Sequence, residues 1–164
     1  MNAPPNLYKE IKMAMDIFAG SHIKVFVAEN STTVATTWQE VPEVASFVVG
    51  STESTVIEVV TYNQKFNRKL LGTQSIPNID LQVNLLPDNA VHELLKTHAE
   101  DQTRLQVKIE VYENATMTTG FYDIYRIFIS TNTVAGSKDE VVTATFTLAV
   151  DGAPLESGLL PKKP

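Results

Sequence analysis

The chain contains few residues whose types and spacing could support catalysis or metal binding. Asp88 and His92 are four residues apart in a segment that follows Pro87, so on a helix they would share one face. A protein metal site of the zinc type needs three or four ligands, and this pair supplies only two. We therefore interpret His92 as a surface histidine that hydrogen-bonds to the Asp88 carboxylate in the first helical turn.

The remaining candidate groups also lack chemical partners. His98 follows the apolar residues of the same segment, which is typical of a partly buried histidine, and His22 begins a strand. No serine lies in a Gly-x-Ser-x-Gly elbow, and no glycine-rich loop carries a Walker lysine. Without cysteine, the chain has no thiolate nucleophile or ligand and no disulfide. The sequence therefore predicts no enzyme, no catalytic residue, no metal and no cofactor.

Composition excludes further classes of function. Nineteen acidic and thirteen basic residues give a net charge of −6, whereas a protein that grips nucleic-acid phosphates usually shows the opposite balance. No basic start is followed by an uninterrupted apolar region, and nothing approaches the roughly 20 apolar residues of a membrane helix. We expect neither a signal peptide nor a membrane partner.

One local cluster of positive charge needs a separate explanation. Lys65, Arg68 and Lys69 lie close together in a polar stretch of this acidic protein. They could contact phosphate, but pairing with acidic residues of a neighbouring subunit explains them equally simply and fits the overall charge better. We interpret them as candidate inter-subunit contacts.

Period-2 alternation of apolar and polar residues dominates the chain and predicts strands. The segment Gly120–Ser130 differs because it is apolar on both faces, so both of its faces should be covered. At 164 residues and 43% hydrophobic content, the strands can enclose one core. We predict a mainly β fold, an antiparallel β-sandwich or partly closed barrel, with strands over residues 22–28, 44–49, 55–62, 79–85, 104–112, 120–130 and 142–150.

A single short α-helix is predicted from Asp88 to about Ala99. Pro87 fits the entry to a first helical turn, and the Asp88 side chain can cap the exposed amides there. Val91, Leu94 and Leu95 form one apolar stripe, which should pack against the sheets.

Three segments show no regular strand pattern. Residues 1–20 form an arm, either extended or with a short helix over Tyr8–Phe18. A long polar loop covers Asn63–Pro77, and residues 153–164 form a proline-containing tail. We assign residues 21–152 to one β-sandwich domain. An arm, a loop and a tail on a small acidic sandwich favour self-assembly, because each can cover a neighbour's strand edges. The arm's apolar side chains are candidate contacts: Ile11, Met13, Met15, Ile17 and Phe18.

Four passages within residues 18–155 resemble the major tail tube proteins of long-tailed, non-contractile bacteriophages of the lambda type. Ala19–Val27 is similar to the small-residue entry to the family's first strand, and Trp38–Val44 to a tryptophan that leads into the next strand. Leu71-Gly72 followed by residues 79–95 is similar to the family's strand-to-helix corner. Gly120–Pro154 resembles its closing hairpin. We expect two departures from the lambda-type pattern, a longer and more apolar arm and no additional immunoglobulin-like domain.

The resemblance implies a structural protein of the virion tail. Such proteins form hexameric rings that stack into a hollow tube, assemble in the host cytoplasm, and contact other phage tail proteins. One sheet of each subunit lines the bore, and double-stranded DNA passes through without specific binding. The loop over Asn63–Pro77 would then become ordered between rings, with Lys65, Arg68 and Lys69 among its contacts.

Two alternatives remain open from the sequence. A tube subunit of a type VI secretion or related contractile injection system would share the fold and the ring geometry, although Trp38 and the Gly-x-Pro exit at 152–154 favour the phage tube. A ligand-binding barrel would need an apolar cavity. The Thr143, Thr145 and Thr147 face instead indicates a solvated or subunit-facing surface.

Overall fold

A computed structural model describes residues 22–48 and 51–161 of the chain. Within these residues the fold is mainly β, with antiparallel strand pairs and one short helix, as predicted. The elements, in chain order, are β1 (Ile23–Glu29), β2 (Gln39–Glu40), β3 (Val44–Phe47), β4 (Glu53–Val59), β5 (Arg68–Ser75), β6 (Ile79–Asn84), α1 (Ala90–Asp101), β7 (Arg104–Tyr112), β8 (Gly120–Ala135), β9 (Thr143–Val150) and β10 (Glu156–Leu160).

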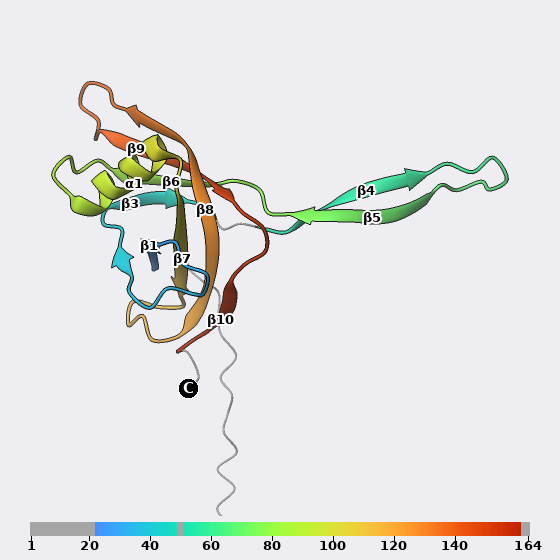
Figure 1. The fold of residues 1–164 in the computed structure, drawn as a ribbon, viewed down its shortest axis with the longest axis horizontal. Coiled ribbons are helices and arrows are strands. Elements are labelled where there is room, and N and C mark those ends of the chain that lie inside the picture. Colours follow the sequence, from blue (N-terminus) through green and yellow to red (C-terminus); the bar gives the residue numbers. More distant parts are fainter. Residues whose placement is uncertain (1–21, 49–50, 162–164) are drawn as a thin grey trace, which may run out of the picture.

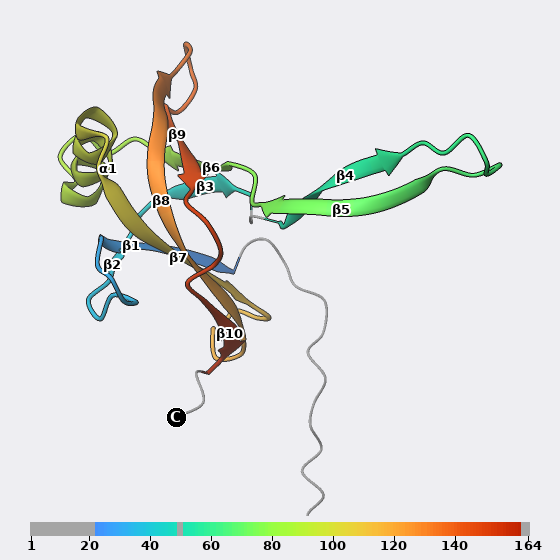
Figure 2. The same ribbon diagram turned by 45° about the vertical axis from the view of Figure 1, so that its right-hand side comes forward.

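The main sheet has the strand order β2-β1-β7-β8-β9-β6-β3, with β10 added on β8. Strand β8 is long enough to belong to two halves of this sheet, as Figure 2 shows. Residues 120–128 of β8 pair with β7 and residues 120–124 pair with β10, whereas residues 127–135 pair with β9, with a register shift between Ile129 and Thr131. We call β2, β1, β7, β10 and the first part of β8 the first half-sheet. The second half-sheet consists of β3, β6, β9 and the last part of β8.

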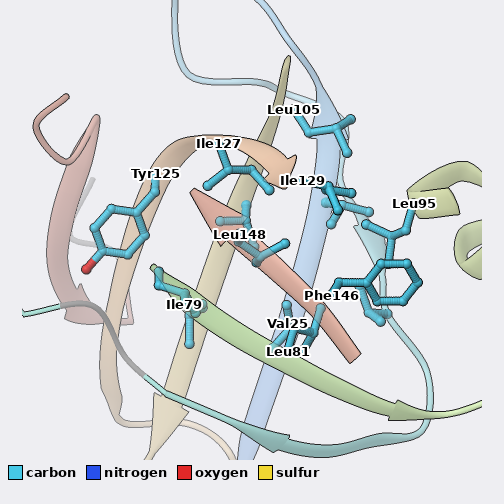
Figure 3. Packing of buried hydrophobic residues seen from close by; sticks show 14 of the residues in the cluster. Val25, Ile79, Leu81, Leu95, Leu105, Tyr125, Ile127, Ile129, Phe146 and Leu148 are labelled. Carbon is cyan, nitrogen blue, oxygen red and sulfur yellow. The ribbon is translucent and has the colours of Figure 1, made fainter. Parts of the chain in front are cut away.

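The core lies between the two half-sheets. It is filled by every second residue along the strands, whose side chains point inward. Leu105, Val107 and Ile109 of β7 are buried, and so are Ile79, Leu81 and Val83 of β6. Figure 3 shows Leu95 of α1 pointing towards Phe146 and Ile129. The sheet does not close, because β2 and β3 end its path without pairing to one another. The architecture is therefore a sandwich or partly closed barrel with a continuous apolar interior.

Helix α1 begins two residues later than predicted because its capping residue is Asn89. The Asn89 side-chain oxygen accepts hydrogen bonds from the backbone N–H groups of Val91 (2.9 Å) and His92 (3.2 Å). Both Asn and Asp favour this position, so the local sequence did not separate Asp88 from its neighbour. Leu95 is fully buried, while Val91 and Leu94 are half-buried and pack against the core.

Two segments that lack a strand pattern in the sequence are strands in the structure. Within Asn63–Pro77, interpreted as a loop, Arg68–Ser75 forms β5 and pairs with β4. Within the proline-containing tail, Glu156–Leu160 forms β10 and pairs with residues 120–124 of β8. Gly158 permits this pairing, because an added Cβ would lie 3.0 Å from the Tyr122 ring. The apolar residues of the arm lie outside the described residues.

The outward face of the first half-sheet is partly covered, which explains the apolar character of both faces of β8. Gln106 is completely buried on this face and holds the segment 31–35 against it. Its amide nitrogen donates to the Thr33 carbonyl at 2.7 Å, and its amide oxygen accepts from the Ala35 N–H at 2.9 Å. Tyr122 and Ile124 are buried beside it.

Alkaline pH should destabilise this fold through Tyr125. Burial, together with the negative charge of Asp123 and a hydrogen bond to it, raises the pKa of Tyr125 to about 12. The folded protein therefore holds this proton more tightly than the unfolded chain, whose tyrosines titrate near 10. The stabilisation is complete below pH 10 and is lost as the pH rises towards 12. We expect Tyr125→Phe to flatten this decline, measured by urea unfolding between pH 8 and 12. An unchanged slope would contradict the assignment.

Candidate assembly surfaces

His92 is buried and belongs to the scaffold, so the interpretation of it as a surface histidine is wrong. It is 3% exposed, and its Nδ1 accepts a hydrogen bond from the Leu86 N–H at 3.2 Å. A neutral ring with Nδ1 accepting carries its proton on Nε2, which donates to the Pro42 carbonyl at 3.1 Å. The ring therefore joins the chain before β3 to the corner between β6 and α1. Asp88 is exposed and takes no part in these bonds.

Replacing His92 should lower stability without involving a metal. Asparagine is too short to bond both backbone groups, and a buried group left unpaired costs about 1–3 kcal/mol. We expect His92→Asn to lower the free energy of unfolding by about that amount. His98→Asn is the control, because His98 contacts Thr103 and the exposed Glu29 and should change stability less. Urea unfolding with and without a chelator measures both effects, and a loss of stability caused by the chelator would contradict a purely structural role.

The described residues contain no arrangement suited to a metal or a buried ligand. No three His, Asp or Glu side chains among them are grouped as ligands. The space between the half-sheets is occupied by core side chains. A cavity of about 240 Å³ lies beside α1, lined in part by Leu86, His92 and Phe146. Two larger hollows of about 380 Å³ lie outside the core, one along residues 28–39 and one beside Arg104 and Arg126. None of the three lies between the half-sheets, where a ligand-binding barrel would hold an apolar ligand.

Among the described residues, half of the exposed large apolar side chains lie on a projecting hairpin formed by β4 and β5. Figures 1 and 2 show it extending away from the main sheet, and the two strands pair only with each other. An isolated two-stranded hairpin is marginally stable in water, and most of the large apolar side chains here face solvent. We call this segment, residues 51–77, the hairpin; its exposed apolar residues are Val56, Ile57, Val60, Tyr62, Phe66, Leu70 and Leu71.

The hairpin is apolar on both of its faces. Val56 stands opposite Leu71, and the next pair along, Ile57 opposite Leu70, points to the other face. Leu70 is 54% exposed and Leu71 is 75% exposed. A surface of this kind is typical of an interaction site, because an apolar patch left in water favours association.

The three predicted cationic residues lie together at the outer part of the hairpin. Lys65 is in the connection between the strands, and Arg68 and Lys69 open β5. Lys69 stands opposite Glu58, whose carboxylate accepts a hydrogen bond from the Asn67 side chain at 3.0 Å. All three cations are exposed. The sequence therefore drew attention to the charged residues of this surface but missed the apolar pairs, whose one signal was the adjacent apolar residues Val56-Ile57 and Leu70-Leu71.

Comparison with known proteins gives one family and several similar structures. The family described as phage tail tube protein, TTP, matches residues 10–155. No curated protein sequence matches the chain. One similar structure is the SPP1 tail tube, with 10% identity and a TM-score of 0.63 over 88% of this chain and 79% of that one.

Two other structures have the same fold at similarly low identity. The anti-feeding prophage baseplate structure has 13% identity and a TM-score of 0.67, over 89% of this chain and 97% of that one. The virion of a native gene transfer agent particle has 13% identity and a TM-score of 0.60, over 84% and 97%. Among the described residues, no helix is long and apolar enough to cross a membrane. Because the family match spans most of the sequence and its β domain, the chain belongs to the phage tail tube protein family and is a structural protein of the virion tail.

Proposed function

We propose that this chain forms hexameric rings, that the rings stack into a hollow tube, and that double-stranded DNA passes through the tube without specific binding. The observation that carries the proposal is the hairpin, which exposes apolar pairs on both faces and pairs with no other described element. Two similar structures are described as having sixfold symmetry, the anti-feeding prophage baseplate and the tail of an empty gene transfer agent particle. Their shared fold supports sixfold rings here.

The exposed apolar side chains of the hairpin contribute a large part of the burial energy that the described residues can supply for assembly. Burying a large apolar side chain contributes roughly 1.5–3 kcal/mol, so covering the exposed parts of seven such side chains contributes on the order of 5–10 kcal/mol. Exposed ion pairs contribute about 0–1 kcal/mol each. Because both faces are apolar, the hairpin inserts between two other copies instead of lying on one.

The same role accounts for the remaining properties of the chain. A tube wall needs no catalytic group, so we propose that the protein is not an enzyme and that its partners are itself and other phage tail proteins. Assembly takes place in the host cytoplasm. Residues 1–20 act as an arm and residues 21–152 as the tube domain. Segment 153–164 is attached to that domain through β10.

Electron microscopy of the purified protein tests the proposal. Negative staining should show hollow tubes, with sixfold symmetry in end views or class averages. A protein that stays monomeric at every concentration and salt tested would contradict the proposed assembly.

A tube subunit of a contractile injection system is the second candidate, because the anti-feeding prophage structure has a TM-score as high as that of the phage tube. Neighbouring genes separate the two. Capsid genes without a sheath gene indicate a non-contractile phage tail, whereas a sheath gene without capsid genes indicates an injection system.

A further inference from the structure

The outward face of the second half-sheet has an unusual composition. On β9, Thr143, Thr145 and Thr147 point away from the core, because Ala144, Phe146 and Leu148 between them are buried. Strand pairing places further polar side chains beside them. We call this surface the threonine face, made up of Ser46, Asp80, Gln82, Asn84, Thr131, Thr133, Thr143, Thr145 and Thr147.

The threonine face is polar but nearly uncharged. Asp80 is the one charged residue among the nine, and it accepts a hydrogen bond from the Thr147 hydroxyl at 2.8 Å. A second carboxylate, that of Glu43, lies at the edge of the face, where it accepts a hydrogen bond from the Asn84 amide at 3.2 Å. The Gln82 amide lies 3.5 Å from the Thr143 hydroxyl, and Thr145 stands opposite Thr133. These nine side chains include no lysine, no arginine and no large apolar residue. The face therefore has neither the fixed positive charge that holds phosphate nor the apolar area that drives association.

The outward face of the first half-sheet has the opposite chemistry. It carries Lys24, Arg104, Lys108 and Arg126, each held by a partner on the same surface. The Lys108 Nζ lies 2.8 Å from the Glu110 Oε1 atom and over the rings of Phe26 and Trp38. This face is partly covered by segment 31–35 through Gln106. Of the two outward faces, only the threonine face is open and free of basic groups.

We infer that the threonine face lines the channel and that the surface passing over it is the phosphate backbone of duplex DNA. This inference rests on the proposed tube, whose wall must include one outward face of each subunit. A wall of fixed cations would release counterions and hold DNA at every ring, which slows transport. Hydroxyl and amide groups keep the wall hydrated, and water bridges exchange as the phosphates move past. The charged face of the first half-sheet then lies away from the channel.

The absence of cysteine from the chain permits a direct test of this orientation. Thr133→Cys places a single thiol on the threonine face, and Thr145→Cys places one at the paired position. Lys96→Cys is the matched control, because α1 packs on the core side of the same half-sheet and Lys96 is exposed. Each variant is assembled with an excess of wild-type protein, so that tubes form even where the variant alone would assemble poorly. Two maleimides are compared. N-ethylmaleimide is small enough to enter the channel, whereas the second maleimide is attached to a protein that is too wide to enter it.

In free subunits, both reagents should label Thr133→Cys and Lys96→Cys. In tubes, Thr133→Cys should still react with N-ethylmaleimide but no longer with the protein-sized reagent. Lys96→Cys should still react with both reagents. Equal labelling of Thr133→Cys by the large reagent in tubes would place the face outside and overturn the inference. Loss of both reactions at Thr133→Cys and Thr145→Cys would place the threonine face in a subunit interface and would also overturn the inference. Failure of the wild-type protein to form tubes would instead contradict the proposed function.

Discussion

Replacing one apolar pair of the hairpin is expected to prevent tube assembly at concentrations where the wild-type protein assembles. The variants are Ile57→Thr with Leu70→Thr, which alters one face, and Val56→Thr with Leu71→Thr, which alters the other. Each double change removes about 3 kcal/mol of burial per subunit, which corresponds to roughly a hundredfold higher critical concentration. Threonine favours strands, so the hairpin itself should persist. Sedimentation and negative-stain microscopy measure the loss of tubes.

The matched control separates assembly from folding. Leu159→Thr changes a side chain that is 64% exposed on β10, comparable to Leu70 and Leu71, but lies far from the hairpin in the fold. All three variants should keep the wild-type circular dichroism and unfolding midpoint, because none of these side chains belongs to the core. If only one of the two hairpin variants fails to assemble, the hairpin is covered on one face only. If both assemble as well as Leu159→Thr, the hairpin is not an assembly contact.

The sequence predicted strands best where one face is buried and the other is wet. Strand β6 matches the predicted residues 79–85 to within one residue, because Ile79, Leu81 and Val83 are buried while the polar residues between them are more exposed. Strand β5 could not be found in this way. Neither of its faces meets the core, so nothing constrains its sequence to period 2, and Arg68–Ser75 reads as a polar loop.

The candidate sites could likewise be predicted only where neighbours in sequence are also neighbours in the fold. Lys65, Arg68 and Lys69 are neighbours in sequence, so their proximity on the hairpin followed from the chain itself. The environment of His92 did not, because one of its two partners, Pro42, is 50 residues away. The threonine face is intermediate, since the three threonines of β9 were visible in the sequence, whereas Thr131, Thr133, Asp80 and Gln82 join them only through strand pairing.

Deleting residues 1–18 is expected to abolish tubes while leaving a folded domain. The described core contains only residues from Val25 onwards, so its packing does not depend on the arm. Rings of a protein with a net charge of −6 repel one another, and stacking needs a contribution that exceeds this repulsion. We propose that burial of the arm's apolar side chains supplies it, at roughly 1.5–3 kcal/mol each. The side chains concerned are Ile11, Met13, Met15, Ile17 and Phe18. Circular dichroism and electron microscopy of the truncated protein follow folding and assembly.

A charge-reversed variant decides between the arm and the cationic cluster as the dominant contact. Changing Lys65, Arg68 and Lys69 to glutamate removes ion pairs worth about 0–1 kcal/mol each and adds repulsion, and both effects weaken as salt screens them. This variant should therefore assemble slowly and recover in part with added salt. The truncated protein should recover less, because salt weakens the repulsion between acidic rings but does not replace the lost apolar burial. The reverse pattern would make charge the dominant contact: normal tubes without the arm, and a charge-reversed protein that stays monomeric at every salt concentration.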